Sequence, residues 1–203
     1  MSDTALITVI MDRSGSMRPL QGWAIEAFND YLAQQCLEGS TRWTLTLFDT
    51  KVTTPFVAIP GREVVPLDVR TYQPGGMTAL YDAVGRTLDR TKRWIHHQPK
   101  PDRPDSVVVV IITDGLENAS RHWSQPQVTA LIRRLEDRGW QFVFMGADQD
   151  SWAVGHSLGI QRGVTVDWSR SRASMRAAMA EANEATIDYR RTQVQQQRHR
   201  DHR

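Results

Sequence analysis

Two apolar runs, residues 5–11 and 107–112, constrain the possible folds of this chain more than any other feature. The first run is too short to cross a bilayer and carries no basic leader, so it predicts a buried strand rather than a membrane span or signal peptide. The second is apolar on both sides, as expected for a strand between two layers of helices. Helical patterns at residues 23–32, 80–95 and 128–135 alternate with the strands. This alternation predicts an α/β fold with a mostly parallel sheet.

The remaining strands complete an open sheet. Strand patterns are found at residues 43–48, 52–59, 140–145 and 164–166. The link Asp49-Thr50-Lys51 is too short for a parallel crossover, so the two strands that it joins must be antiparallel. Residues 60–76, rich in Pro and Gly, are predicted to form a long surface loop.

Oxygen-bearing side chains gather where these strands and helices meet loops. Asp12, Ser14 and Ser16 follow the first apolar run, and Thr78 opens a helical pattern. Asp114 follows the second apolar run, from which Thr113 separates it. Carboxylates and hydroxyls suit Mg²⁺, Mn²⁺ or Ca²⁺ better than zinc or copper. Each part alone could be a turn or a helix cap, but three parts in this order predict a metal site.

This triple pattern resembles the von Willebrand factor A (VWA) domain and its metal-ion-dependent adhesion site (MIDAS). The resemblance implies that Ser14, Ser16 and Thr78 bind the metal directly, and that Asp12 and Asp114 hold it mostly through water. It covers roughly residues 5 to 168 and implies a doubly wound, Rossmann-like sheet of order 3-2-1-4-5-6. Strands one and four are then neighbours at the point where the order reverses, where open α/β sheets bind ligands.

The resemblance also implies a function. In the family, the open coordination position accepts a carboxylate from a partner protein. The expectation is therefore a non-enzymatic, Mg²⁺-dependent interaction module whose partner presents Asp or Glu. It is similar to small stand-alone bacterial or phage proteins, some of which occur in stress-response and tellurium-resistance settings.

A metal-dependent hydrolase is the alternative function. It lacks a general base, because no His lies in the motif loops, and no Gly-rich phosphate loop is present. A second enzyme signal is Gly155-His156-Ser157-Leu158-Gly159, which matches the nucleophile elbow of α/β-hydrolases but has no strand immediately before it. No catalytic residue is therefore predicted.

Composition bounds the organisation of the chain. Its 203 residues are predicted to form a VWA domain over 1–169 and a helix with a basic, Gln/Arg-rich tail over 170–203. The tail holds eight Arg against four acids, a weak nucleic-acid signal that we interpret as a solubilising terminus. A single cysteine, Cys36, excludes an intramolecular disulfide and favours a reducing, cytoplasmic location.

Two hypotheses concern the surroundings of the metal site. Arg13 lies between the first two motif residues, where its charge would favour an acidic partner. Glu117 and Asn118, just after Asp114, are candidates for the partner surface.

Overall fold

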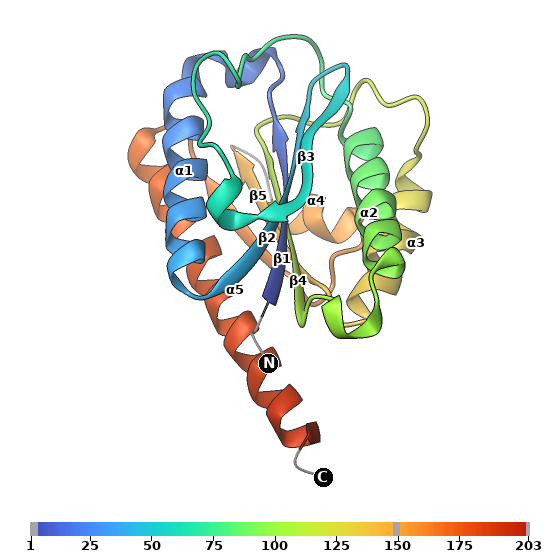
Figure 1. Cartoon of the computed structure of the whole chain (residues 1–203). Coiled ribbons are helices and arrows are strands. Elements are labelled where there is room, and N and C mark those ends of the chain that lie inside the picture. Colours follow the sequence, from blue (N-terminus) through green and yellow to red (C-terminus); the bar gives the residue numbers. More distant parts are fainter. Residues whose placement is uncertain (1–3, 148–150, 202–203) are drawn as a thin grey trace.

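The computed structural model describes residues 4–147 and 151–201, which form one six-stranded sheet with helices on both faces (Figure 1). The strand order is β3-β2-β1-β4-β5-β6, as predicted. Only the β2–β3 pair is antiparallel. The strands are β1 (Thr4–Asp12), β2 (Ser40–Phe48), β3 (Val52–Pro60), β4 (Ser106–Thr113), β5 (Gln141–Ala147) and β6 (Val164–Trp168). The α-helices are α1 (Gln21–Leu37), α2 (Leu80–His97), α3 (Gln125–Glu136), α4 (Ser151–Ser157) and α5 (Arg172–Asp201), with short 3-10 helices η1 (Gly15–Leu20), η2 (Gly61–Glu63) and η3 (Lys100–Asp102).

The central strands are apolar on both sides because they separate two hydrophobic layers. Ile7 and Val9 of β1 point into a core shared with α1 and α5, whereas Ile10 points into a second core shared with α2 and α3. This alternation follows from the two-residue period of a strand. Figure 1 shows the sheet nearly edge-on, with α1 and α5 on one side and α2 and α3 on the other.

Helix α5 is joined to α1 by buried polar contacts as well as by apolar packing. Tyr31 and Thr186 share a hydroxyl hydrogen bond of 2.8 Å, and Gln35 Nε2 donates to Asn183 Oδ1 at 2.7 Å. Arg190 Nη1 donates to Gln35 Oε1 at 2.8 Å. Buried polar groups of this kind stabilise a fold only when paired, so this network fixes the register of α5 on α1.

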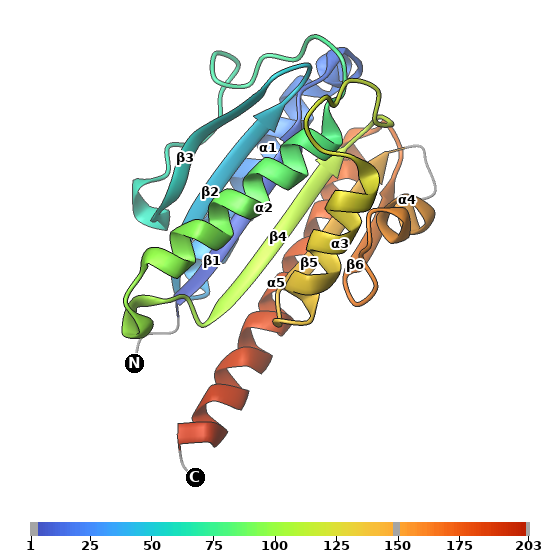
Figure 2. The same ribbon diagram turned by 90° about the vertical axis from the view of Figure 1, so that its right-hand side faces the viewer.

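The structure refines two predictions. The segment 60–76 is a loop, but Val64, Leu67 and Tyr72 within it are buried rather than exposed. The Asn29 side chain of α1 accepts from the Leu67 backbone N–H and donates to its carbonyl, which ties the loop down. Helix α5 also runs on to Asp201, through the Gln/Arg-rich segment that was predicted to follow the helix as a tail, and extends past the rest of the molecule (Figure 2).

No helix in the described part of the chain is both long enough and apolar enough to cross a membrane.

Candidate metal centre

The carboxylate of Asp12 lies at the carboxyl end of β1, between two neighbouring strands. Its side chain is fully buried, and because Met11 of β1 pairs with Ile112 of β4, Asp12 lies beside Thr113. Asp12 Oδ2 accepts a hydrogen bond of 2.6 Å from Thr113 Oγ1, and Oδ1 accepts one of 2.6 Å from the Ser14 backbone N–H. Two neutral donors therefore orient the carboxylate.

Burial raises the pKa of Asp12 from 3.8 to about 6, because removing a carboxylate from water disfavours its charged form. The hydrogen bonds from Thr113 and Ser14 oppose this effect without cancelling it, and the charge of Asp114 adds a smaller increase. The site therefore holds an incompletely compensated buried acid. A cation bound beside it would favour the ionised form.

A chain of hydroxyl groups joins the two carboxylates. Ser14 Oγ lies 3.0 Å from Ser16 Oγ, and Ser16 Oγ donates to Asp114 Oδ1 at 2.7 Å. Gly15 turns the backbone between the two serines, and its N–H donates to the Gly76 carbonyl at 3.0 Å. The loop after β1 is thereby held against the loop before α2, which places both hydroxyls next to Asp114.

Thr78 faces the same space from the start of α2. A Cβ placed on Gly115 would lie 3.3 Å from Thr78 Oγ1 and 4.0 Å from Ser16 Oγ, so both hydroxyls surround the small volume that this glycine leaves open. The Thr78 N–H donates to Asn118 Oδ1 at 2.8 Å, and the Asn118 N–H donates to the Thr78 carbonyl at 3.0 Å. All five side chains predicted for the site are brought together at this edge of the sheet.

The loop between β4 and α3 is held by α2 rather than left open to solvent. Asp82 accepts hydrogen bonds from three backbone N–H groups, those of residues 121, 122 and 123. Burial alone would raise the pKa of Asp82, but these donors outweigh it and hold the pKa below its ordinary value. In return Glu117 accepts from the Tyr81 N–H at 2.8 Å, and Ser120 Oγ from the Asp82 N–H at 2.9 Å.

These contacts change the interpretation of Glu117 and Asn118. Both were candidates for the partner surface, but their side chains accept backbone hydrogen bonds at the start of α2. Arg13 is likewise engaged within the chain, because its Nε lies 3.0 Å from Asp49 Oδ2 and both side chains are only 18% exposed. Arg13 thus ties the motif loop to the turn between β2 and β3.

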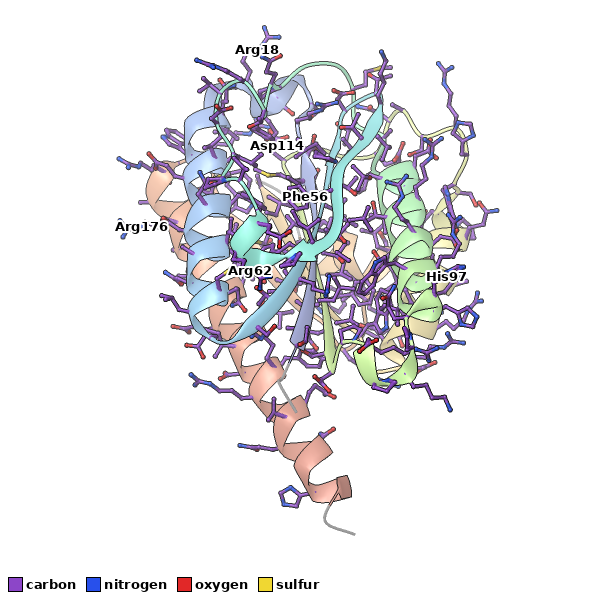
Figure 3. All side chains as sticks on the ribbon, in the orientation of Figure 1. Arg18, Phe56, Arg62, His97, Asp114 and Arg176 are labelled. Carbon is purple, nitrogen blue, oxygen red and sulfur yellow. The ribbon has the colours of Figure 1, made fainter. Side chains whose placement is uncertain are left out.

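Three residues at the site were not found from the sequence. Thr113 orients Asp12 through a hydrogen bond. Because Thr113 directly precedes Asp114 in the motif, its sequence position could have marked it as a site residue. Tyr72 donates to the Asp12 carbonyl at 2.5 Å from the long loop. Arg170, between β6 and α5, places Nη2 3.2 Å from Asp114 Oδ2. No local pattern points to either of the last two, because tertiary structure alone brings them to the strand ends. Figure 3 labels Asp114, which lies beneath the loops at this end of the molecule.

The donor chemistry fits a hard cation. Among residues 4–147 and 151–201, no three His, Cys, Asp or Glu side chains come together in a group that could hold a metal ion. The potential ligands are instead three hydroxyls backed by two carboxylates. Oxygen-only sets of this kind suit Mg²⁺, Mn²⁺ or Ca²⁺.

The nucleophile-elbow motif does not form an elbow. Ser157 is the last residue of α4, and its hydroxyl donates to the Val154 carbonyl of the same helix at 2.8 Å. An elbow requires the serine on a sharp turn directly between a strand and a helix. The structure therefore does not support Ser157 as a nucleophile.

Fold and strand order define the class: the chain has the VWA fold. Solved structures similar to it include the PilB minor pilin from Streptococcus sanguinis (TM-score 0.65, 11% identity, covering 92% of this chain and 62% of the pilin). They also include the SpRpn10 VWA domain (TM-score 0.57, 12% identity, covering 89% of this chain and 95% of that domain).

A third similar structure is proximal thread matrix protein 1 from the mussel byssus with a zinc-occupied MIDAS motif. Its TM-score is 0.58 at 16% identity, and the match covers 92% of this chain and 46% of that protein. The chain thus spans about half the length of the mussel protein. No protein-family model matches the chain, and no curated protein matches it either.

Proposed function

We propose that the chain is a metal-dependent protein-interaction module with Mg²⁺ as its ion. Ser14, Ser16 and Thr78 would bind the metal directly, and Asp12 and Asp114 would hold it mostly through water. The observation that carries the proposal is the hydroxyl chain between the two carboxylates, with Ser14 Oγ 3.0 Å from Ser16 Oγ and Ser16 Oγ 2.7 Å from Asp114 Oδ1.

The partner is proposed to present an Asp or Glu carboxylate. Neutral hydroxyl ligands leave the ion with most of its charge, which favours an incoming anion. The zinc in the MIDAS motif of the mussel protein supports a divalent ion at such a site. The oxygen-only donors of this chain favour Mg²⁺, with Mn²⁺ and Ca²⁺ as further candidates.

We place this function in the cytoplasm, in a bacterial stress-response or phage setting, on the basis of the lone Cys36 and the family resemblance. The division into a site-bearing part over 1–169 and a terminal helix and tail over 170–203 remains part of the proposal. It is supported by the sequence positions of all five site residues, which lie between the end of β1 and the start of α3 and therefore before residue 170.

The proposal is tested by calorimetric titration of metal-free protein with Mg²⁺ and Mn²⁺. We expect saturable binding by the wild type that is lost in Ser14→Ala and Ser16→Ala. Ser157→Ala removes a hydroxyl outside the site and is the matched control, which should bind as the wild type does. Thermal unfolding establishes that each variant is folded. Binding that persists in folded Ser14→Ala, or none by the folded wild type, would contradict the proposal.

A metal-dependent hydrolase remains the second candidate, because the same residues could hold an ion that polarises a substrate. The variants above separate the two functions. Turnover of generic phosphoester or ester substrates that disappears in Ser14→Ala but persists in Ser157→Ala would favour the hydrolase. Metal binding without turnover favours the interaction module.

A further inference from the structure

A cationic pocket lies at the opposite end of the sheet from the metal centre. Its volume is about 480 Å³, and it is lined by the last turns of α2 and α3 and by the residues just before β4 and β5. Helices α2 and α3 lie side by side on this face (Figure 2). His97, the last residue of α2, is well separated from Asp114 in Figure 3.

Positive charge is concentrated in the lining of this pocket. Its lining includes Lys92, Arg93, Arg103, Arg134 and Arg138 but no Asp or Glu. Over the whole chain, 25 Lys and Arg are nearly balanced by 23 Asp and Glu, so this excess is local. A concave surface lined by one sign of charge concentrates the field acting on an oppositely charged ligand.

Three of these five cations have partners within the chain, and the other two, Arg134 and Arg138, do not have one among the described residues. Asp89 pairs with both Lys92 and Arg93, at 3.1 and 3.0 Å. Arg103 donates to carbonyls at the end of α2. Arg134 and Arg138 form no side-chain ion pair or hydrogen bond with any of the described residues. Their guanidinium groups are the ones available to a ligand.

The floor of the pocket is apolar. Leu131 and Leu135 are buried beneath it, and the partly buried side chains of Ile95 and Trp140 add further apolar surface to the lining. Flat rings gain free energy by stacking on such surfaces, especially on an indole. Arginine forks bind phosphate oxygens through paired, charge-assisted hydrogen bonds.

We propose that this pocket binds a nucleoside polyphosphate, with its phosphates on Arg134 and Arg138 and its base on the apolar floor. The volume of the pocket lies within the range of small-molecule sites, about 300–1,000 Å³. The pocket is a compact hollow, whereas a site for single-stranded nucleic acid would be an extended groove. Binding here requires no Gly-rich loop, because side chains rather than backbone amides supply the positive charge. The proposal is independent of the metal centre.

The test is titration of the full chain with ATP in the presence of EDTA, in a Ser14→Ala background, so that no metal can bridge the phosphates to the other site. We expect saturable binding that falls at least about tenfold when Arg134 and Arg138 are both changed to Gln. Arg133→Gln is the matched control. Arg133 also lies in the last turn of α3 and is exposed, but it does not line the pocket, so affinity should stay within about twofold.

Two further probes test the ligand class. Inorganic tripolyphosphate should bind more weakly than ATP, because it cannot use the apolar floor. Affinity for tripolyphosphate equal to that for ATP would overturn the assignment of a nucleotide. An equal loss in Arg133→Gln, no ATP binding by the folded protein, or binding of a Glu-rich peptide in place of ATP would overturn it as well. Thermal unfolding verifies that every variant is folded.

Discussion

Replacing Asp12 with Asn is expected to stabilise the metal-free protein at neutral pH. Asn has nearly the same shape, and its carbonyl oxygen can accept from the Ser14 N–H as Asp12 Oδ1 does. Its amide can donate to Thr113 Oγ1, whose own proton can go to the Gly115 carbonyl 3.1 Å away. The substitution therefore removes a buried charge while keeping both hydrogen-bonded neighbours satisfied.

The magnitude follows from the pKa of Asp12, which burial raises from 3.8 to about 6. Between these two pH values the folded protein binds more protons than the unfolded chain, so stability falls as pH rises. At about 1.4 kcal/mol per pKa unit, the loss is about 3 kcal/mol by pH 7. Asp12→Asn lacks this loss and should be more stable by up to about 3 kcal/mol at pH 7.5, with little difference near pH 4.

The assay is urea unfolding of both proteins in EDTA from pH 4 to pH 7.5. Asp188→Asn removes an exposed carboxylate and controls for the change in net charge. A stability difference between wild type and Asp12→Asn that does not change with pH would refute the reasoning. So would an Asn variant less stable than wild type at pH 7.5. Saturating Mg²⁺ should stabilise the wild type and leave Asp12→Asn nearly unchanged.

Three further substitutions test the scaffold, each measured by urea unfolding. Asp82→Ala removes the acceptor for three backbone N–H groups and should cost about 2–3 kcal/mol; a cost below 0.5 kcal/mol would contradict a structural role for this clamp. Gly85→Ala would place a methyl group 2.1 Å from the Trp123 ring and should cost about 1–3 kcal/mol, whereas Gly22→Ala, with open space around it, should be neutral or stabilising. Arg190→Ala leaves buried acceptors on α1 unpaired and should cost about 2–3 kcal/mol, with an unchanged urea midpoint as the contrary result.

The approximate positions of the elements could be predicted because burial determines them locally, whereas the strand order was implied by the resemblance to the VWA domain. The run at 107–112 is wholly apolar and the run at 5–11 has Thr8 as its one polar residue, a pattern that the centre of a covered parallel sheet accommodates. The three-residue link after Phe48 required the one antiparallel pair, and the structure has it there. Given the strand order that the resemblance implied, the convergence of Asp12 and Asp114 was expected, since both are at the carboxyl ends of neighbouring parallel strands.

Contacts between loops could not be predicted, because they depend on side chains far apart in sequence. Asp82 lies within an amphipathic helix, and nothing near it indicates that it accepts three hydrogen bonds from residues 121–123. Tyr72 is part of a Pro- and Gly-rich stretch that predicts exposure, yet it is fully buried and bonded to the Asp12 carbonyl. The Pro and Gly content of a loop indicates which backbone conformations it can adopt. It does not indicate which residues a single aromatic side chain in the loop contacts.

The two carboxylates of the metal centre differ in how their charge is balanced, and this difference indicates where a metal acts on stability. Asp114 has the Arg170 guanidinium 3.2 Å away. Asp12 is held by neutral donors, Thr113 and the Ser14 N–H, and burial still raises its pKa to about 6. A divalent ion near Ser14 and Ser16 would therefore act mainly on Asp12, by offsetting the free-energy cost of burying its ionised carboxylate. Because that carboxyl must be ionised to assist the ion, metal affinity should rise with pH up to about 6 and level off above it.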